Sequence, residues 1–149
     1  MENLDNAYAG CEEEGFIKKQ DGVDIELIKS LLTRTKEGVE SFKAMEKVVK
    51  YNSILFHNKY DILREIISAF VLFDKIKSSN HLCLFAHLCK KHPELELNWE
   101  DFETFRILRN QVCYEGKEVS DEVWKKIRVN FDIYIRTFIK EVENKLKQS

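Results

Sequence analysis

The residue types best suited to chemistry lie close together in one stretch of the chain, which contains Arg106, Arg109, Asn110 and Tyr114. If this stretch is helical, a turn of about 100° per residue places Arg109 near the middle of an apolar arc that begins at Phe102. Burial of a lone charge is costly, so this arginine needs a carboxylate partner, a polar cleft or a bound anion. The other three residues recur every four positions and form a polar ridge along the edge of the arc. A guanidinium, an amide and a phenol together can hold a phosphate or a base, so we expect these residues to bind a ligand.

A structural role for Arg109 is the alternative. A guanidinium can form a forked ion pair with a carboxylate, and Glu65 and Asp61 are available on a neighbouring predicted helix. Structural ion pairs of this kind are common, so residue chemistry alone leaves both roles open.

Histidine and cysteine are concentrated in a second stretch, which contains His81, Cys83, His87, Cys89 and His92. Cys83 and His87 are one helical turn apart, as two ligands of a metal ion would be. A structural zinc site needs four converging ligands, however, and a single helix cannot direct all five side chains to one point. We therefore predict no metal site and no cofactor. His81 follows a run of N-cap residues, so it either caps and packs its helix or serves as a catalytic group.

The composition favours a helical protein with one domain. The chain has 149 residues, of which 44% are hydrophobic, and this is enough to bury one sizeable core. It contains one proline and five glycines, whereas a sheet-rich domain needs many turns that use these residues. Charged residues make up 34% of the chain, yet the net charge is only −2 because the two signs are mixed. This pattern is typical of solvated helix faces and does not indicate a broad basic surface for duplex DNA or a membrane.

The four cysteines of the chain are expected to be reduced. The N-terminus is acidic and lacks the apolar segment of a secretory signal, and no apolar run approaches the length of a membrane span. We therefore predict a cytoplasmic protein without a disulfide framework.

The periodicity of apolar residues predicts five helices joined by short connections, an all-α up-and-down bundle formed by residues 23–149. Residues 1–22 are polar and acidic and are expected to form an N-terminal arm, either frayed or docked. The second helix, predicted from Tyr60 to Ile76 after a break at residues 51–58, is apolar on more than one side and should be central or face a second subunit. The helices are expected to begin near Asp24, Tyr60, Asn80, Trp99 and Ser120.

Residues 106–116 resemble the signature of HEPN domains, a family of helical proteins found among ribonucleases and toxin–antitoxin partners. That signature is an arginine followed by a polar residue, with a histidine four to six positions beyond the arginine, and Arg109 and Asn110 match its first part. The resemblance covers residues 15–147 and is closest to small stand-alone archaeal members. Further segments resemble the family's central helix, the turn before its next helix and the entry to its last helix, in that order: residues 60–69, 77–81 and 116–121.

The resemblance implies a dimer in which an arginine and a histidine from two subunits form a composite, metal-independent site that cleaves RNA. In this chain the position of the histidine is occupied by Tyr114. A tyrosine titrates near about 10 and is a poor general base at neutral pH. We therefore expect an RNA- or nucleotide-binding module that is non-catalytic or atypical, in which Arg109, Asn110 and Tyr114 of two copies share a cleft.

Two alternatives follow from the same resemblance. One is a toxin-like, metal-independent endoribonuclease, for which Arg109, Tyr114 and His81 are the catalytic candidates. The other is the HEPN partner of a nucleotidyltransferase in a toxin–antitoxin pair. Members of that group often carry a tyrosine two residues after the histidine, and Gly116 occupies that position here.

Overall fold

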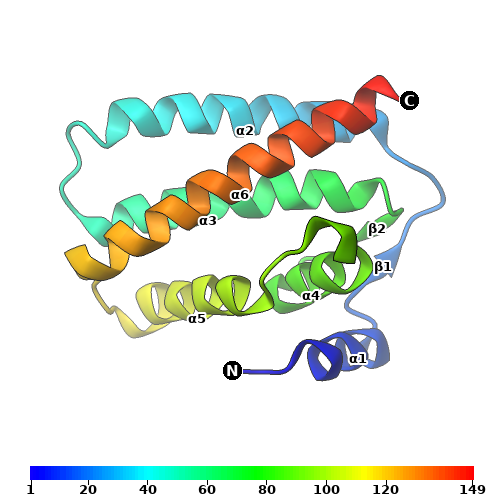
Figure 1. Cartoon of the computed structure of the whole chain (residues 1–149), viewed down its shortest axis with the longest axis horizontal. Coiled ribbons are helices and arrows are strands. Elements are labelled where there is room, and N and C mark those ends of the chain that lie inside the picture. Colours follow the sequence, from blue (N-terminus) through cyan, green and yellow to red (C-terminus); the bar gives the residue numbers. More distant parts are fainter.

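The computed structural model describes all 149 residues and consists of six α-helices, a two-stranded sheet and a short 3₁₀-helix (Figure 1). The expected all-α bundle is therefore confirmed, with one helix more than the five predicted. None of the helices combines the length and the apolar character that crossing a lipid bilayer requires. In chain order the elements are α1 (Leu4–Glu14), β1 (Lys18–Lys19), α2 (Ile25–Met45), α3 (Asn52–Leu72), β2 (Ile76–Lys77), α4 (His81–Lys91), the 3₁₀-helix η1 (Pro93–Leu95), α5 (Trp99–Glu115) and α6 (Asp121–Lys147).

Helix α3 forms the centre of the bundle and packs against α2, α4, α5 and α6. Figure 1 shows α2, α3 and α6 as the three long helices, with α4 and α5 following one another along a neighbouring row. The broad apolar surface of α3 is buried within the chain itself. Of the two positions expected for this helix, central in the bundle or facing a second subunit, the structure shows the central one.

The core is a continuous cluster of 27 buried residues. Its aromatic rings join three helices: Phe105 of α5 stacks on Phe131 of α6 with 4.3 Å between ring centroids, and Phe56 of α3 lies 5.5 Å from Phe131. A second pair, Phe102 and Tyr134, also joins α5 to α6, with 4.8 Å between centroids. These contacts fix the orientation of α5, and with it the direction in which the polar side of this helix faces.

The ends of several helices lie at the capping residues that the sequence predicts. The side chains of Asp24, Asn80 and Ser120 accept hydrogen bonds from backbone N–H groups in the first turns of α2, α4 and α6, respectively. Gly116 ends α5 with a left-handed φ of 63°, a conformation that residues with a side chain rarely adopt.

Helix α3 differs most from its predicted range. It begins at Asn52, inside the stretch predicted to be a break, and it ends at Leu72 rather than near Ile76. The Asn52 side chain donates a 3.0 Å hydrogen bond to the backbone carbonyl of Val119, a contact between segments far apart in the sequence. At the other end, Lys75 has a φ of 62° and turns the chain into β2. Neither of these features leaves a signal in the local sequence of the helix.

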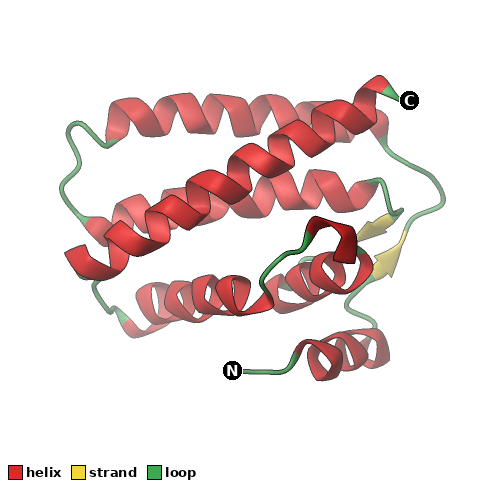
Figure 2. Cartoon of the chain, in the orientation of Figure 1, coloured by secondary structure: helices red, strands yellow, loops and turns green.

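Residues 1–22, which were predicted to form a polar arm, contain a folded helix rather than a frayed segment. Helix α1 packs against α4, where Ala7 and Tyr8 are buried beside Ala86. The next residues form β1, which pairs antiparallel with β2 (Figure 2). The segment is ordered because tertiary contacts and sheet pairing outweigh its weak apolar pattern.

The prediction that all four cysteines are reduced is wrong for two of them. A disulfide joins Cys11 of α1 to Cys83 of α4, across 72 positions of the sequence. Cys89 is a buried free thiol, and burial raises its pKa to about 12, whereas Cys113 is a free thiol on the surface. Spacing along the chain gave no indication of the disulfide, because the pairing depends on α1 docking on α4.

Candidate functional site

A polar cleft lies where the start of α4 faces the second half of α5. Its volume is about 390 Å³, and its walls are residues 79–82 on one side and Arg106, Arg109, Asn110 and Tyr114 on the other. The helical period of α5 places these four side chains along one side of the helix. The structure therefore brings the ligand-binding residues predicted from the sequence into one cleft, and it adds the first turn of α4 as the opposite wall.

Arg109 is partly buried in this cleft and faces two aromatic rings. Its guanidinium carbon lies 5.8 Å from the ring centroid of Tyr60 and 5.6 Å from that of Tyr114. The Nη1 group donates a 3.3 Å hydrogen bond to the Tyr114 hydroxyl oxygen. The Nε atom is buried and has no hydrogen-bond partner in the protein. Apart from the bond to Tyr114, the Nη groups donate no hydrogen bond within the protein, so the guanidinium keeps unused donors.

No carboxylate forms an ion pair with Arg109. Of its two expected partners, Glu65 faces Arg34, with 3.0 Å between the Arg34 Nε and the Glu65 Oε1, and Asp61 lies beside His57. Every other arginine that is not exposed has an acidic partner. The ion-pair alternative for Arg109 is therefore wrong with respect to both carboxylates, and aromatic contacts provide only part of the compensation that its charge needs.

Arg106, in contrast, is engaged by a buried carboxylate. Glu103 is 1% exposed and accepts two hydrogen bonds from Arg106, at 2.7 Å from Nε and at 3.2 Å from Nη2. The hydrogen bond to Glu103 raises the pKa of Arg106 further above its usual value. Arg106 therefore lines the cleft with only part of its donors free, and its main contact is internal.

His81 is the first residue of α4, and its Nδ1 lies 2.9 Å from the Tyr60 hydroxyl. Tyr60 is fully buried, and burial raises the pKa of its phenol, so the hydroxyl stays protonated and needs an acceptor. Nδ1 is its only partner, which identifies the hydroxyl as the donor and puts the ring proton of neutral His81 on Nε2. Burial, followed by the charge of Arg109, lowers the pKa of His81 to about 4, so the ring is neutral at pH 7.

The cleft is rich in donors and poor in bases. The Arg109 guanidinium, the Asn110 amide and the His81 Nε2–H can all donate, whereas none of the residues that line the cleft is a carboxylate. A general base at neutral pH needs a pKa near about 7 and a free lone pair. His81 has neither, because its pKa is about 4 and its Nδ1 lone pair accepts from Tyr60. The arrangement is suited to binding an anionic group such as a phosphate rather than to removing a proton.

Tyr114 lies at the mouth of the cleft, with 74% of its surface exposed. Its hydroxyl oxygen accepts a hydrogen bond from Arg109, so the proton of this hydroxyl remains free to donate to a ligand. The exposed ring can stack on a nucleobase, since every base offers an aromatic face.

Sequence reasoning missed two residues of this site, Tyr60 and Glu103. Glu103 lies three positions before Arg106, so helical spacing was an available signal for their ion pair. Tyr60 was predicted as the first residue of a helix, yet it is the residue that sets the proton position on His81. No sequence signal could have found this contact, because the two residues come from different helices.

No family model, curated protein or solved structure matches this chain. The resemblance to HEPN domains therefore depends on the order and spacing of the motifs in the sequence, and it stays a prediction.

Proposed function

We propose that this protein is a HEPN-like binding module that holds the phosphate group of an RNA or a nucleotide in the cleft of Arg109. The observation that carries the proposal is the guanidinium of Arg109, which borders a polar cleft and has no carboxylate partner. A bound phosphate would supply the missing negative charge and would accept hydrogen bonds from the free donors. In this arrangement Asn110 and His81 orient the phosphate, and Tyr114 stacks on the base.

The proposed module is a homodimer in which the clefts of two copies face each other. The position of Tyr114 supports this arrangement, because its largely exposed ring at the mouth of the cleft is free to contact a second copy. A ligand longer than one nucleotide would then meet Arg109 of both copies.

The proposal includes the cytoplasm as the location, since RNA and nucleotides are abundant there. The Cys11–Cys83 disulfide is the feature that argues against it, because disulfides are typical of oxidising compartments.

Fluorescence anisotropy with a labelled pool of single-stranded RNA tests the binding function directly. We expect the wild type to bind and Arg109→Ala to lose about tenfold or more in affinity, the range of a charge-assisted hydrogen bond. Arg136→Ala is the matched control, since Arg136 is exposed on α6 and forms no ion pair, and it should bind like the wild type. Added inorganic pyrophosphate should compete, because the phosphate is the recognised group.

The binding function would be refuted if the wild type bound neither RNA nor nucleotides, or if Arg109→Ala bound as tightly as Arg136→Ala. Circular dichroism of both variants shows whether each is folded, so a loss of affinity is not confused with a loss of structure.

A metal-independent endoribonuclease is the second candidate, and the observation that favours it is the presence of His81 in the same cleft as Arg109. With a pKa of about 4 the His81 ring is neutral at pH 7, so in such an enzyme its Nε2–H would donate a hydrogen bond to the phosphate rather than transfer a proton. Incubation of the protein with an RNA pool in the presence of a chelator distinguishes the two functions. Cleavage that is lost in both Arg109→Ala and His81→Gln would establish the endoribonuclease. Binding of RNA without cleavage would support the non-catalytic binding module.

A further inference from the structure

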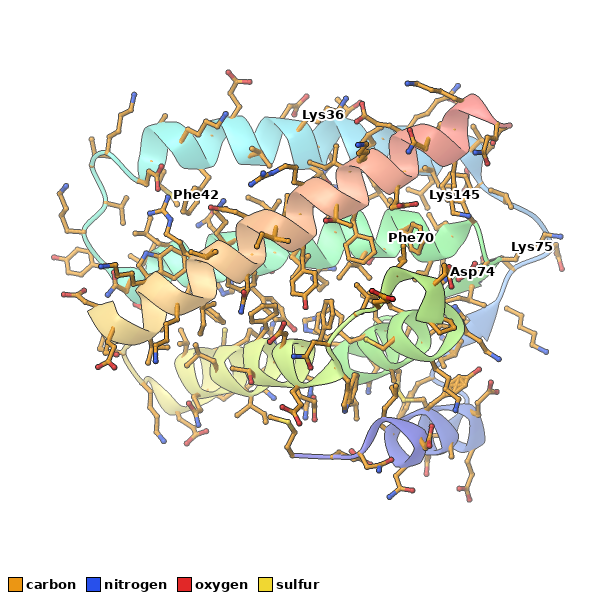
Figure 3. The ribbon with its side chains drawn as sticks, in the orientation of Figure 1. Lys36, Phe42, Phe70, Asp74, Lys75 and Lys145 are labelled. Carbon is orange, nitrogen blue, oxygen red and sulfur yellow. A yellow bond between two sulfur atoms is a disulfide. The ribbon has the colours of Figure 1, made fainter.

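A second cluster of ionisable side chains lies away from the cleft, where the end of α3 meets α4 and η1. The Asp74 Oδ2 atom lies 2.9 Å from His87 Nε2 and 2.6 Å from His92 Nε2, and the ligand atoms of the three residues all lie within 4.8 Å of one another. Figure 3 labels Asp74 at this end of the molecule, close to Phe70 and Lys145. Two imidazole nitrogens thus face one carboxylate oxygen, and the three possible ligand atoms form one cluster.

The spacing of these three atoms is close to that of a metal site. Metal–ligand bonds of about 2.0–2.2 Å put the ligand atoms of a tetrahedral zinc ion about 3.4 Å apart. The two hydrogen bonds that Asp74 accepts therefore need to widen by less than about 1 Å. Three protein ligands leave one position for water, and the Asp74 side chain is 24% exposed, which opens that position to solvent.

A fourth residue is placed as a supporting carboxylate. Glu94 Oε1 lies 2.9 Å from His92 Nδ1, on the opposite side of the ring from the nitrogen that faces Asp74. A carboxylate that accepts from one imidazole nitrogen holds the proton there and leaves the lone pair of the other nitrogen for a metal. The ring of Phe70 packs edge-on against His92, with 4.7 Å between centroids, and limits its rotation.

The backbone on both sides of the cluster is held in an uncommon conformation. Lys75 and Glu96 are the non-glycine residues of the chain with positive φ, at 62° and 51°. Lys75 directly follows Asp74, and Glu96 follows Glu94 by two positions. Such conformations persist only where the surrounding structure enforces them, so the turns that present the two carboxylates have a defined geometry.

His87 determines how tightly an ion could be held. Its side chain is 6% exposed, and its Nδ1 atom is buried without a hydrogen-bond partner. When Nε2 gives its lone pair to a metal, the ring proton moves to Nδ1, which has no hydrogen-bond acceptor within reach. This penalty weakens binding relative to a closed site with four protein ligands, so we expect an exchangeable ion.

We propose that Asp74, His87 and His92 bind one divalent transition-metal ion, zinc being the best match to this ligand set, with Glu94 positioning His92. The site is independent of the proposed RNA-binding function, since it shares no residue with the cleft of Arg109. Sequence reasoning did not find it, because Asp74 comes from the turn after α3 whereas the two histidines belong to α4 and its end.

The test is titration of the chelator-treated, dialysed full-length chain with Co²⁺, followed by its visible absorption, and with Zn²⁺ by calorimetry. Cys113 and His57 form a separate thiol–imidazole contact of 3.5 Å, so every measurement is made in a Cys113→Ser background. We expect saturation at one ion per chain, an intense Co²⁺ spectrum typical of low coordination number, and a higher Tm with Zn²⁺ than with Mg²⁺.

Variants assign the binding to this cluster. His92→Gln should abolish the Co²⁺ spectrum, and Glu94→Gln, which changes a side chain that is 62% exposed, should weaken binding by about 10–100-fold while leaving the fold intact. His57→Gln and His81→Gln are matched controls and should bind like the background protein. The proposal is overturned if the background protein shows no Co²⁺ spectrum and no binding heat. It is also overturned if His92→Gln binds the metal as tightly as the background protein.

Discussion

The two arginines of the cleft are held in opposite ways at the residue scale. Arg106 neutralises a buried carboxylate, and removal of one partner of such a pair leaves an uncompensated charge on the other. Arg109 lies against two aromatic rings, and its removal leaves no charge unpaired. Stability and ligand binding should therefore depend on different arginines.

Arg106→Ala should lower the free energy of unfolding by about 3–5 kcal/mol, because Glu103 would remain buried without a partner. Arg109→Ala should lower it by less than about 1 kcal/mol, because it loses cation–π contacts with two rings but also removes a buried N–H group that has no partner. Urea denaturation followed by circular dichroism measures both. The double variant Glu103→Leu/Arg106→Leu should recover most of the Arg106→Ala loss, and equal losses for the two single variants would contradict the assignment.

His81 predicts a pH dependence of stability. An unfolded histidine titrates near about 6.5, whereas burial lowers the pKa of His81 to about 4 in the folded protein. Between these values the unfolded chain binds a proton that the folded chain does not, so the free energy of unfolding falls as the pH decreases from 6.5 towards 4. The ring is partly solvated, which limits the effect to on the order of 1–2 kcal/mol.

Chemical denaturation of wild type and His81→Gln at several pH values between about 4 and 7 checks this prediction. The variant should lose less stability on acidification than the wild type. His57→Gln, which removes a surface histidine, serves as the control and should retain the wild-type dependence. Parallel pH curves for wild type and His81→Gln would show that His81 is not buried in its neutral form.

Helix α4 connects the principal features of the molecule at the scale of the elements. Its first turn forms one wall of the cleft, Cys83 ties it to α1, and His87 in its second half belongs to the proposed metal site. Helix α1 is also held by Ala7 and Tyr8, which are buried against Ala86, whereas the exposed ion pair of Lys90 with Asp5 is of the kind that contributes little. The disulfide is therefore the main covalent constraint on the position of α1 against α4.

Removal of the disulfide by Cys11→Ala/Cys83→Ala should lower the free energy of unfolding by about 2–4 kcal/mol, because the bond closes a long loop in the unfolded chain. Thermal unfolding of the wild type with and without a thiol reductant gives an independent estimate of the same loss. Cys113→Ala is the control, since this cysteine is free and exposed. Two results together would show that the bond does not form: a Tm that is insensitive to reductant, and alkylation of all four cysteines rather than only the two that are free in the structure.

The whole molecule is a bundle around α3, and one side of it carries the cleft between α4 and α5. The aromatic contacts of α5 with α4 and α6 hold the inner side of α5, so its outer side can vary without loss of the fold. A cleft of about 390 Å³ that opens to solvent is large enough for a phosphate and its sugar, and a second copy would close it further.

The proposed dimer predicts a particle of twice the 17.7 kDa chain mass in size-exclusion chromatography with light scattering. Tyr114→Arg should shift the particle towards the monomer, because a charge added at the mouth of each cleft would face its copy across the interface. Val48→Arg, another exposed apolar position, is the matched control. A monomer at high concentration would refute the shared cleft. The ligand would then have to bind to the cleft of a single copy.

The sequence alone determined the features that depend on neighbours along the chain. The helix starts at Asn80 and Ser120 were found because capping involves backbone groups only a few positions away. Helical periodicity likewise placed Arg109 and Tyr114 on one side of a single helix.

The tertiary structure alone decided which side chains from different elements meet. It turned Glu65 towards Arg34 instead of Arg109, and it set Tyr60 against His81. It also brought α1 to α4, where two cysteines 72 positions apart form a disulfide. These contacts depend on how the core packs the helices together, and core packing is a sum of many contacts between distant residues that no local pattern encodes.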